Sequence, residues 1–419
     1  MYLRHLRLTD IRCFADVEID FDIEGADNRK WTVLLGENGS GKSTVLKAIG
    51  AVMGGSDAVI ELVGNSDTWI RRGAETGRIE AVISTKHDDA RKIALEFHRG
   101  EGPTAFIARS QKTLRRLNEA LAHTPRNYPI FAYGASRRLA SGGRFDSDAR
   151  FRHPRARSMA SLFDRNAQLN PLEQWAMRLD YASDGERIEV VRRVLDDFLP
   201  DLHFAHIDKQ AETLMFRTPD GLVPLDQLSD GYQNVAAWIG DLLYQITLVF
   251  DDYQQPLHAR GLLVIDEVDL HLHPKWQRRL LAFLDQQLPH MQLVVTTHSV
   301  VTAQQAPEGA LHYCIRRNGR APEIEQFSGD PGTFLLNQLI VTEAFGHVSD
   351  ESMELEQEKD RYRSLARQPE RTAEDAAEMQ RIASKVGSVP DDPVETAHLS
   401  PRQQELLRSM LAAKGETSE

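Results

Sequence analysis

The sequence has few of the features that mark secreted, metal-stapled or membrane-spanning proteins. Only two of its 419 residues are cysteine, Cys13 and Cys314, and their separation suits neither a disulfide framework nor a zinc site. The N-terminus, MYLRHLRLTD, lacks an apolar signal core, and the longest apolar stretch, residues 235–250, is interrupted by Asp241 and Gln245. We therefore expect a cytoplasmic protein without a membrane segment.

Positive charge is also in deficit. The chain has 50 Lys and Arg against 62 Asp and Glu, which gives a net charge of −12. This balance argues against a protein coated uniformly for DNA, but it leaves room for local basic patches. The 41% apolar and 27% charged residues are typical of a globular protein, and the length permits two or three domains or one large α/β core with insertions.

A glycine-rich segment, GENGSGKST at residues 36–44, follows the apolar run 31–35 and leads into the apolar residues 45–49. This pattern predicts a strand, a loop and a helix start. The three glycines leave backbone N–H groups free to face a polyphosphate, and the helix dipole adds to the attraction. We expect Lys42 to reach the β and γ phosphates and Ser43 to bind Mg²⁺. The predicted nucleotide-binding residues here are Gly36, Asn38, Gly39, Ser40, Gly41, Lys42, Ser43 and Thr44.

Two later apolar strands end in side chains suited to phosphate hydrolysis. Residues 261–267, GLLVIDE, predict a buried strand from which Asp266 holds Mg²⁺ and Glu267 takes the proton of the attacking water. Residues 292–297 predict a second buried strand, and His298 at its end is expected to hydrogen-bond the γ-phosphate. Either feature alone is common, but their order after a phosphate loop favours a hydrolytic site.

The stretch LSDGYQN, residues 228–234, precedes a helix-like apolar segment that continues to Phe250. We expect Ser229 and Gly231 to grip a γ-phosphate at the N-terminus of this helix. An Asp-Gly turn that only caps a helix would have the same sequence. The position of the stretch, between the phosphate loop and the acidic strand, favours phosphate binding.

The rest of the chain alternates between strand and helix patterns. Strands are predicted within 2–21 as a hairpin, and at 80–85, 92–98, 128–133, 203–207 and 213–216. Helices are predicted at 114–122, 158–181, 185–199, 275–288, 331–345, 350–366, 372–386 and 400–413. We predict a head over residues 1–326, with a helical and basic insertion at about 137–200, and a helical C-terminal domain over 327–419.

Arginine dominates residues 137–157, which end in RFRHPRAR. Such a run can pair with the phosphates of a nucleic acid, but a solvated loop or an interface with acidic parts of the same protein would have the same composition. The loop after 128–133 also lies where ABC-type ATPases carry a glutamine. No glutamine is present, so either Ser136, Arg137 or Arg138 takes its place or the matching loop lies elsewhere.

Taken together, the P-loop, LSDGY, LLVIDE and TTHS resemble in this order the RecF/SMC/OLD branch of the ABC-class ATPases, over residues 1–326. LSDGY is similar to the LSGGQ signature, with Asp230 at the central glycine. LTDIRCF resembles the opening strand of RecF and SMC-type ATPases, which implies that Arg12 lies near the nucleotide, with a surface position as the alternative. DEVDLHLHP resembles RecF-like and OLD ATPases, and the match implies that Asp269 belongs to a D-loop that crosses between protomers.

This resemblance implies an α/β fold, in which an ABC-type ATPase head with an antiparallel β subdomain carries ATP and Mg²⁺ between two head-to-tail copies. The short insertion differs from the long coiled-coil arm of SMC proteins, and no TOPRIM nuclease pattern follows His298. The chain is similar to standalone ATPases of bacterial antiphage systems such as Septu and PARIS. It is therefore expected to be an ATP-gated sensor of a separate effector, such as an HNH or TOPRIM nuclease. The alternative is a RecF-like ATPase that binds DNA in repair.

Overall fold

The computed structural model describes residues 2–21, 30–84, 90–122, 129–139, 151–183, 188–199, 202–250, 256–317, 321–348, 352–366 and 372–386. Its contacts divide the chain into two units, Met1–Val348 and Ser349–Glu419. The division therefore falls after Val348 and not after residue 326. The reason is that the segment 327–348 packs on the larger unit, where Leu339 and Phe345 join the hydrophobic core.

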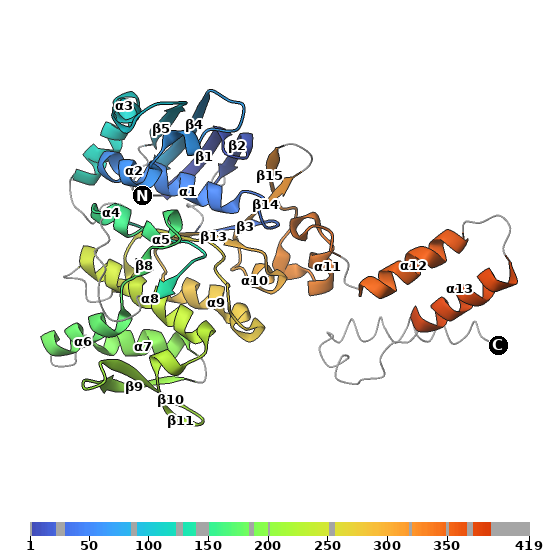
Figure 1. The fold of residues 1–419 in the computed structure, drawn as a ribbon. Coiled ribbons are helices and arrows are strands. Elements are labelled where there is room, and N and C mark those ends of the chain that lie inside the picture. Colours follow the sequence, from blue (N-terminus) through green and yellow to red (C-terminus); the bar gives the residue numbers. More distant parts are fainter. Residues whose placement is uncertain are drawn as a thin grey trace. The chain divides into compact units, whose positions relative to one another are not determined.

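A six-stranded sheet forms the centre of the larger unit, in the order β15-β14-β3-β13-β12-β6 (Figure 1). Its strands are β3 Trp31–Leu35, β6 Ile130–Tyr133, β12 Gly261–Ile265, β13 Met291–Thr297, β14 Leu311–Arg317 and β15 Pro322–Gln326. All pairs are parallel except β14 with β15. Val33 and Leu35 pack into one core and Leu34 into the other, so both faces are buried, as the continuous apolar runs predict.

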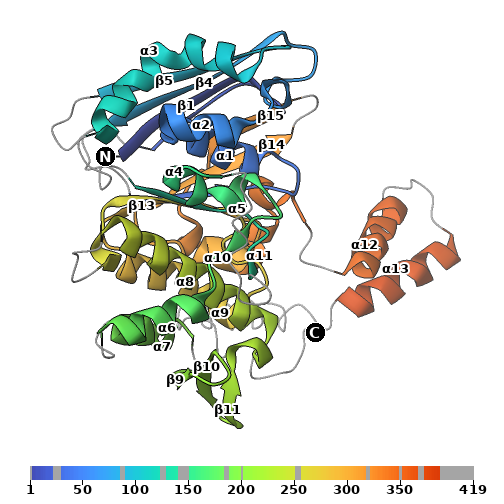
Figure 2. The ribbon, with the colours of Figure 1, turned by 60° about the vertical axis from the view of Figure 1, so that its left-hand side comes forward.

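A second, antiparallel sheet has the order β2-β1-β4-β5, with β1 Tyr2–Ile11, β2 Phe14–Asp20, β4 Thr76–Ser84 and β5 Ala90–His98. Helices α1 Lys42–Met53 and α2 Gly55–Val63 lie between this sheet and the central one, and α3 Pro103–Ala122 lies along the edge strand β5, where Thr113 Oγ1 donates to Ala94 O at 2.7 Å (Figure 2). The predicted hairpin and antiparallel pair are present. Helix α3 begins well before residue 114, at a proline, which fits the first turn of a helix.

Helices cover the opposite face of the central sheet: α8 Asp230–Val249, α9 Pro274–Gln287 and α10 Val300–Gln304. Beyond them lie α6 Leu172–Ser183, α7 Ile188–Phe198 and a small sheet of β9 His203–Asp208, β10 Thr213–Thr218 and β11 Gly221–Pro224 (Figures 1 and 2). These elements share one core with the lower face of the sheet. The α/β fold class is therefore confirmed, with mixed and antiparallel sheets and a helical layer.

Two segments predicted as single helices are broken. Residues 158–181 contribute α5 Ala160–Phe163, the short strand β8 Gln168–Leu169 and most of α6, preceded by α4 Pro154–Arg157. Strand β8 pairs with β7 Arg138–Leu139. The helical pattern fails here because Asp164 Oδ1 accepts a hydrogen bond from Asn166 N at 2.9 Å, which closes a turn, and Pro171 then starts a new helix.

Residues 331–345 likewise form three short pieces: η4 Pro331–Thr333, α11 Leu336–Ile340 and η5 Glu343–Phe345. Asp330 accepts from Gly332 N at 2.9 Å and so fixes a tight turn at the start of this segment. Three further 3₁₀ turns are η1 Ser66–Thr68, η2 Leu225–Gln227 and η3 Pro256–His258. Residues 331–345 are thus not one helix. They belong to the segment 327–348, which we call the strap and which packs on the head.

The smaller unit contains two described helices, α12 Met353–Ala366 and α13 Ala373–Val386, as predicted. Ion pairs join them, with Arg381 3.1 Å from Glu358 and Arg361 3.5 Å from Glu378. The helix predicted at 400–413 lies outside the described residues. Within the described ranges, no helix has the length and apolar character that crossing a bilayer requires.

Candidate active site

The phosphate loop connects β3 to α1. Gly39 has a φ of 78° and Gly41 one of 117°, in the left-handed region that favours glycine. A Cβ on Gly41 would lie 2.5 Å from the Phe14 ring, so the β1–β2 turn fits only a glycine there. Within the loop, Lys42 Nζ donates to Gly36 O at 2.7 Å and to Glu37 O at 3.1 Å. The loop therefore has a fixed curvature with its lysine turned inward, as a phosphate cradle requires.

The remaining predicted loop residues differ in exposure. Asn38, Gly39 and Ser43 are exposed, whereas Ser40 and Thr44 are buried. The hydroxyl of Ser40 has no hydrogen-bond partner among the described residues. The exposed backbone around Gly39, where a Cβ would meet nothing within 4 Å, leaves open space for a polyphosphate.

Asp266 follows β12 and is 5% exposed. Its two carboxylate oxygens accept from two different elements: Oδ1 from Thr296 Oγ1 in β13 at 2.7 Å and Oδ2 from Ser43 Oγ in α1 at 2.6 Å. A hydroxyl and a carboxylate oxygen side by side are the hard donors that Mg²⁺ prefers. The residues predicted to hold the metal are thus in contact, and their donor set fits it.

Glu267 lies beside Asp266 with a φ of 49°, which is unusual for a residue other than glycine. Its Oε2 is 2.5 Å from His298 Nδ1, and its Oε1 is 3.5 Å from Lys42 Nζ. Its amide donates to Thr296 Oγ1 at 2.7 Å. Lys42, Ser43, Asp266, Glu267 and His298, which are far apart in the sequence, therefore meet at one edge of the central sheet.

Asp269, predicted to lie in a loop that crosses between protomers, is buried within its own chain. It is 3% exposed. Its Oδ2 accepts from Thr302 Oγ1 at 2.8 Å, and its carboxylate also accepts from Thr297 Oγ1, at 2.8 Å and 3.0 Å. Because these threonines flank His298, Asp269 ties the loop after Asp266 to the histidine loop.

Arg12, predicted near the nucleotide, stacks on Trp69. Its guanidinium carbon lies 4.5 Å from the centre of the Trp69 ring, and its amide donates to Trp69 O at 2.8 Å. Burial lowers the pKa of this side chain. The neighbouring residues Cys13 and Phe14 lie against the phosphate loop at Gly41.

Ser229 lies at the N-terminus of the long helix α8, where it is exposed and makes no capping hydrogen bond. The signature segment is anchored from behind: a Cβ on Gly231 would lie 3.0 Å from His271 O, and the Tyr232 ring meets the Trp276 ring edge-on at 4.2 Å. The start of α8 is thus held in place on its own chain while Ser229 faces outward.

Arg137, one of three candidates for the missing glutamine position, is buried behind the acidic residues. Its Nη2 donates to the main-chain oxygens of Asp266 at 2.6 Å and Glu267 at 2.5 Å. The loop after β6 therefore reaches the active edge through an arginine that binds backbone. Sequence reasoning also missed Thr296 and Thr302, which orient the carboxylates, because single threonines in or after a strand carry no distinct pattern.

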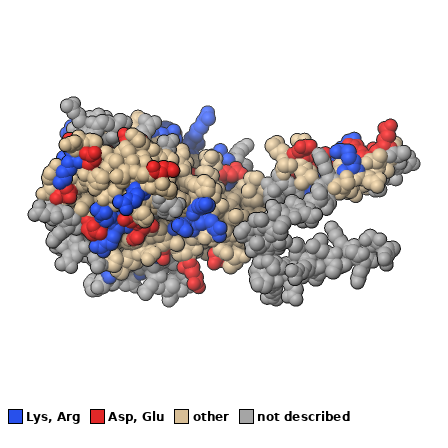
Figure 3. Space-filling view, turned by 90° about the horizontal axis from the view of Figure 1, so that it is seen from below, with Lys and Arg blue, Asp and Glu red and all other residues tan. Residues whose placement is uncertain are grey.

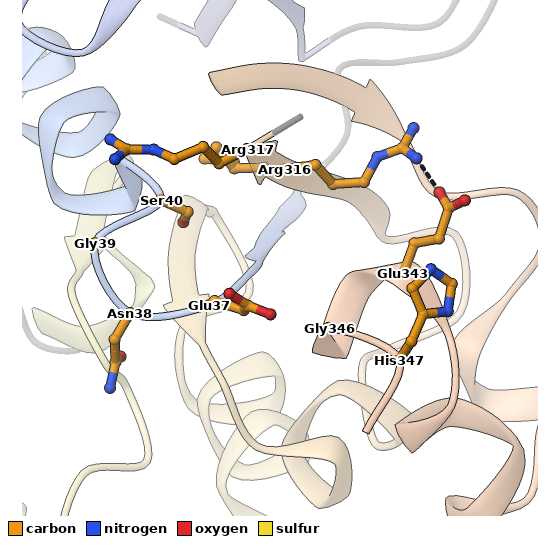
Figure 4. A pocket seen from close by; sticks show the side chains of 10 residues that line it. Glu37, Asn38, Gly39, Ser40, Arg316, Arg317, Glu343, Gly346 and His347 are labelled. Atoms are coloured by element: carbon orange, nitrogen blue, oxygen red, sulfur yellow. Dashed lines mark hydrogen bonds and ion pairs between the residues drawn. The ribbon is translucent and has the colours of Figure 1, made fainter. Parts of the chain in front are cut away.

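A polar cavity of about 360 Å³ lies on the outer side of the phosphate loop (Figure 4). Ser40 and Arg317 line one side, and Glu343 and His347 line the other. Arg316, directed away from Arg317, forms an ion pair with Glu343 (Figure 4). The strap 327–348 therefore completes a wall beside the phosphate loop, which the sequence did not indicate.

The basic run is partly structural. Phe151 is buried, and Arg155 Nη2 donates to Met53 O at 2.8 Å at the end of α1. Burial lowers the pKa of Arg155 to about 10. Arg152 and Arg157 remain exposed, and residues 140–150 of the run lie outside the described ranges. On the face in Figure 3, Lys and Arg are interspersed with Asp and Glu and form no continuous basic surface among the described residues.

Comparison with known proteins agrees with this geometry. Residues 31–303 match the family model described as "AAA domain, putative AbiEii toxin, Type IV TA system". The chain belongs to this family. The matched range begins with β3 and ends in α10, so it includes the phosphate loop, the start of α8, Asp266, Glu267 and His298.

The chain is also similar to proteins of the Septu and retron systems. The chain is 24% identical over 392 residues to "Septu protein PtuA" of Bacillus mycoides, covering 93% of this chain and 51% of that protein. It is 21% identical over 365 residues to "Retron Vc95 probable ATPase" of Vibrio cholerae, covering 71% and 70%. The chain thus spans about half the length of the first relative. The predicted resemblance to ATPases of antiphage systems is confirmed by these matches.

Among solved structures, the chain resembles the SMC head domain from Thermotoga maritima, with 17% identity and a TM-score of 0.45. The alignment covers 78% of this chain and 100% of that one.

Proposed function

We propose that this protein hydrolyses ATP between two head-to-tail copies of itself, and that this cycle controls a separate effector in antiphage defence. One observation carries the proposal. Five groups suited to hydrolysis, from Lys42 to His298, gather at one edge of the sheet, whereas Ser229 is exposed at a helix N-terminus that it does not cap. A second copy would place such a helix end against the bound triphosphate.

Each group has a role that follows from its position. Lys42 would move from the loop carbonyls to the β and γ phosphates, and the amides around Gly39 would hold the phosphate oxygens. Ser43 and Asp266 would hold Mg²⁺, which when bound would offset the charge developing on the phosphates.

Water would attack the γ-phosphorus, the bond from phosphorus to the β,γ-bridging oxygen would break, and Glu267 would accept the water's proton. His298 Nδ1, 2.5 Å from Glu267, would orient that carboxylate and sense the γ-phosphate. Loss of the γ-phosphate would remove the bridge between the two copies, so hydrolysis would loosen the pair.

The defence role is proposed from similarity to the Septu and retron proteins. A separate effector, such as an HNH or TOPRIM nuclease, would respond to the opening and closing of the head. The helical unit that follows Val348 and the layer of α6 and α7 are the two places where an effector is proposed to dock. Co-purification with the product of the neighbouring gene, in ATP and in ADP, tests this role. An equal yield in both nucleotides would contradict nucleotide control.

Glu267→Gln tests the enzymatic core of the proposal. This variant should bind ATP and lose turnover by about 100- to 10,000-fold, because an amide cannot accept the water's proton. With Mg²⁺ and ATP, light scattering should show the 47.3 kDa chain at twice its mass. Turnover at the wild-type rate would remove Glu267 from the role of base, and a monomer that remains saturated with ATP would remove the paired arrangement.

A further inference from the structure

Arg137 is a buried arginine whose guanidinium binds main-chain oxygens. It is 7% exposed. Its Nε donates to Gly134 O at 3.2 Å, and its Nη2 donates to the carbonyl oxygens of Asp266 and Glu267 at 2.6 Å and 2.5 Å. One side chain thus joins the loop after β6 to the backbone of both acidic residues.

The backbone at Glu267 needs such support. A residue other than glycine with a φ of 49° is strained, and such conformations persist where the surroundings hold them. At Glu267 the amide donates to Thr296 Oγ1 and the carbonyl accepts from Arg137, so both ends of the residue are fixed. The side chain is then directed toward His298 and Lys42.

Arg137 also contacts the helix that bears the signature segment. Its guanidinium carbon lies 5.7 Å from the centre of the Trp238 ring in α8, within the range of a cation–π interaction. Helix α8 begins with Asp230, directly after the exposed Ser229. The guanidinium is therefore the point at which α8 and the backbone of Glu267 meet.

We propose that Arg137 is a positioning residue that holds the backbone of Glu267 in its active conformation and links it to the signature helix through Trp238. The inference rests on the proposed role of Glu267 as the base. It extends that role because a shift of α8, on contact with a second copy, would reach Glu267 through one side chain.

Arginine suits this position for two reasons. Its planar fork presents several donors in fixed directions, so it can serve three carbonyl groups at once, which a lysine cannot do with the same geometry. Burial lowers the pKa of Arg137 to about 10, while Asp266, Asp269 and Glu267 act to raise it, so the side chain stays charged at neutral pH.

Four variants of the 419-residue chain, with one further variant as a control, test the inference. Arg137→Met removes the donors and the charge, and Arg137→Lys keeps the charge but loses the fork. Trp238→Leu removes the aromatic contact, with Trp238→Phe as its conservative partner. Arg192→Met is the matched control, because Arg192 also donates to a carbonyl, that of Phe204 at 3.0 Å, and stacks on the same residue's ring away from the active edge.

For each variant, kcat is measured beside the affinity for a fluorescent ATP analogue and the melting temperature. We expect Arg137→Met to lower kcat by about 10- to 100-fold, because small displacements of a reacting group have effects of that size, while affinity changes by less than about threefold. Arg137→Lys should lower kcat less, and Arg192→Met should keep kcat within about twofold.

A folded Arg137→Met protein with wild-type kcat would overturn the inference. So would a loss of affinity that accounts for the whole loss of activity. If Arg137→Met fails to fold, the tryptophan pair decides: a lower kcat for Trp238→Leu than for Trp238→Phe supports the link, and equal values contradict it. Failure of the proposed function is separate, because then Glu267→Gln would turn over ATP as fast as the wild type.

Discussion

The acidic edge of the central sheet and the start of α8 satisfy their polar groups in opposite ways. At the acidic edge, Asp266, Glu267 and Asp269 each have partners within the same chain. At the start of α8, Ser229 is exposed and makes no capping hydrogen bond. A polar group that has all its partners is organised before any ligand arrives, whereas an open helix N-terminus is suited to an anion supplied from outside. The contrast supports the proposal that one region performs chemistry and the other completes the site of a second copy.

The largest effect is expected when each region is disabled in turn by one substitution. Lys42→Ala removes a charge-assisted contact to phosphate and should weaken ATP binding by about 10- to 100-fold. Ser229→Arg should leave ATP binding intact but abolish turnover, because a bulky cation replaces the exposed hydroxyl at the shared site. Asp220→Arg, an exposed change in the turn between β10 and β11, is the control and should have normal turnover.

Mixing the Lys42→Ala and Ser229→Arg proteins tests whether the two regions form one shared site. In a mixed pair, one site would combine Lys42 of one chain with Ser229 of the other, so an equal mixture should recover about a quarter of wild-type turnover if pairing is random. Steady-state phosphate release measures this. If the mixture stays inactive while both proteins form pairs, the two regions do not share a site.

A smaller effect is expected from loosening the acidic edge alone. Thr302→Val removes one of the donors to the buried Asp269 carboxylate, which should lower the free energy of unfolding by about 1–3 kcal/mol. Because Asp269 ties the loop of His298 in place, kcat should also fall, by less than for Arg137→Met. Thr333→Val, whose exposed hydroxyl donates only to Asp330 O, should change stability by less than about 0.5 kcal/mol. Denaturant unfolding measures the free energy of unfolding of both variants. Equal values for Thr302→Val and Thr333→Val would show that the Asp269 network does not contribute to stability.

The smallest effect is expected in the basic run, where two substitutions distinguish a structural arginine from an exposed one. Arg155→Gln loses the bond to Met53 O and should lower the free energy of unfolding by about 1–3 kcal/mol with no change in affinity for duplex DNA. Arg152→Gln, at an exposed position, should leave stability within about 0.5 kcal/mol. Binding of a labelled duplex in low salt provides the second measurement. A salt-dependent loss of binding in Arg152→Gln alone would favour the RecF-like alternative.

The parts of the site that could be predicted are those whose chemistry lies in consecutive residues. A phosphate loop needs its glycines, lysine and serine in one stretch, and a carboxylate at the end of an apolar run is recognisable where it stands. Arg137 could not be assigned in this way, because its partner Glu267 lies 130 residues away. Asp269 was expected at a surface between protomers, but two threonines that sequence reasoning could not connect to it hold it inside the head.

The fold elements also divide into those that the sequence predicts and those that it does not. The central strands were predictable because apolar runs buried on both faces have a simple pattern, and the hairpin because its residues alternate. The broken helices at 158–181 and 331–345 were not, since their apolar spacing is helical and only turns fixed by Asp164 and Asp330 interrupt it. Arg12 was placed by resemblance, and its stacking on Trp69 depends on a contact with a distant turn.

The strap after β15 has a practical consequence for anyone who wishes to shorten this protein. Its side chains Leu339, Ala344 and Phe345 fill the lower core, and Gly346, whose φ of 78° favours glycine, lies against the Glu37 side chain. A chain truncated after Gln326 would expose apolar surface, would be prone to aggregate and would lose one wall beside the phosphate loop. A shortened chain should therefore end no earlier than Val348, even though the recognisable motifs end with His298, about fifty residues before.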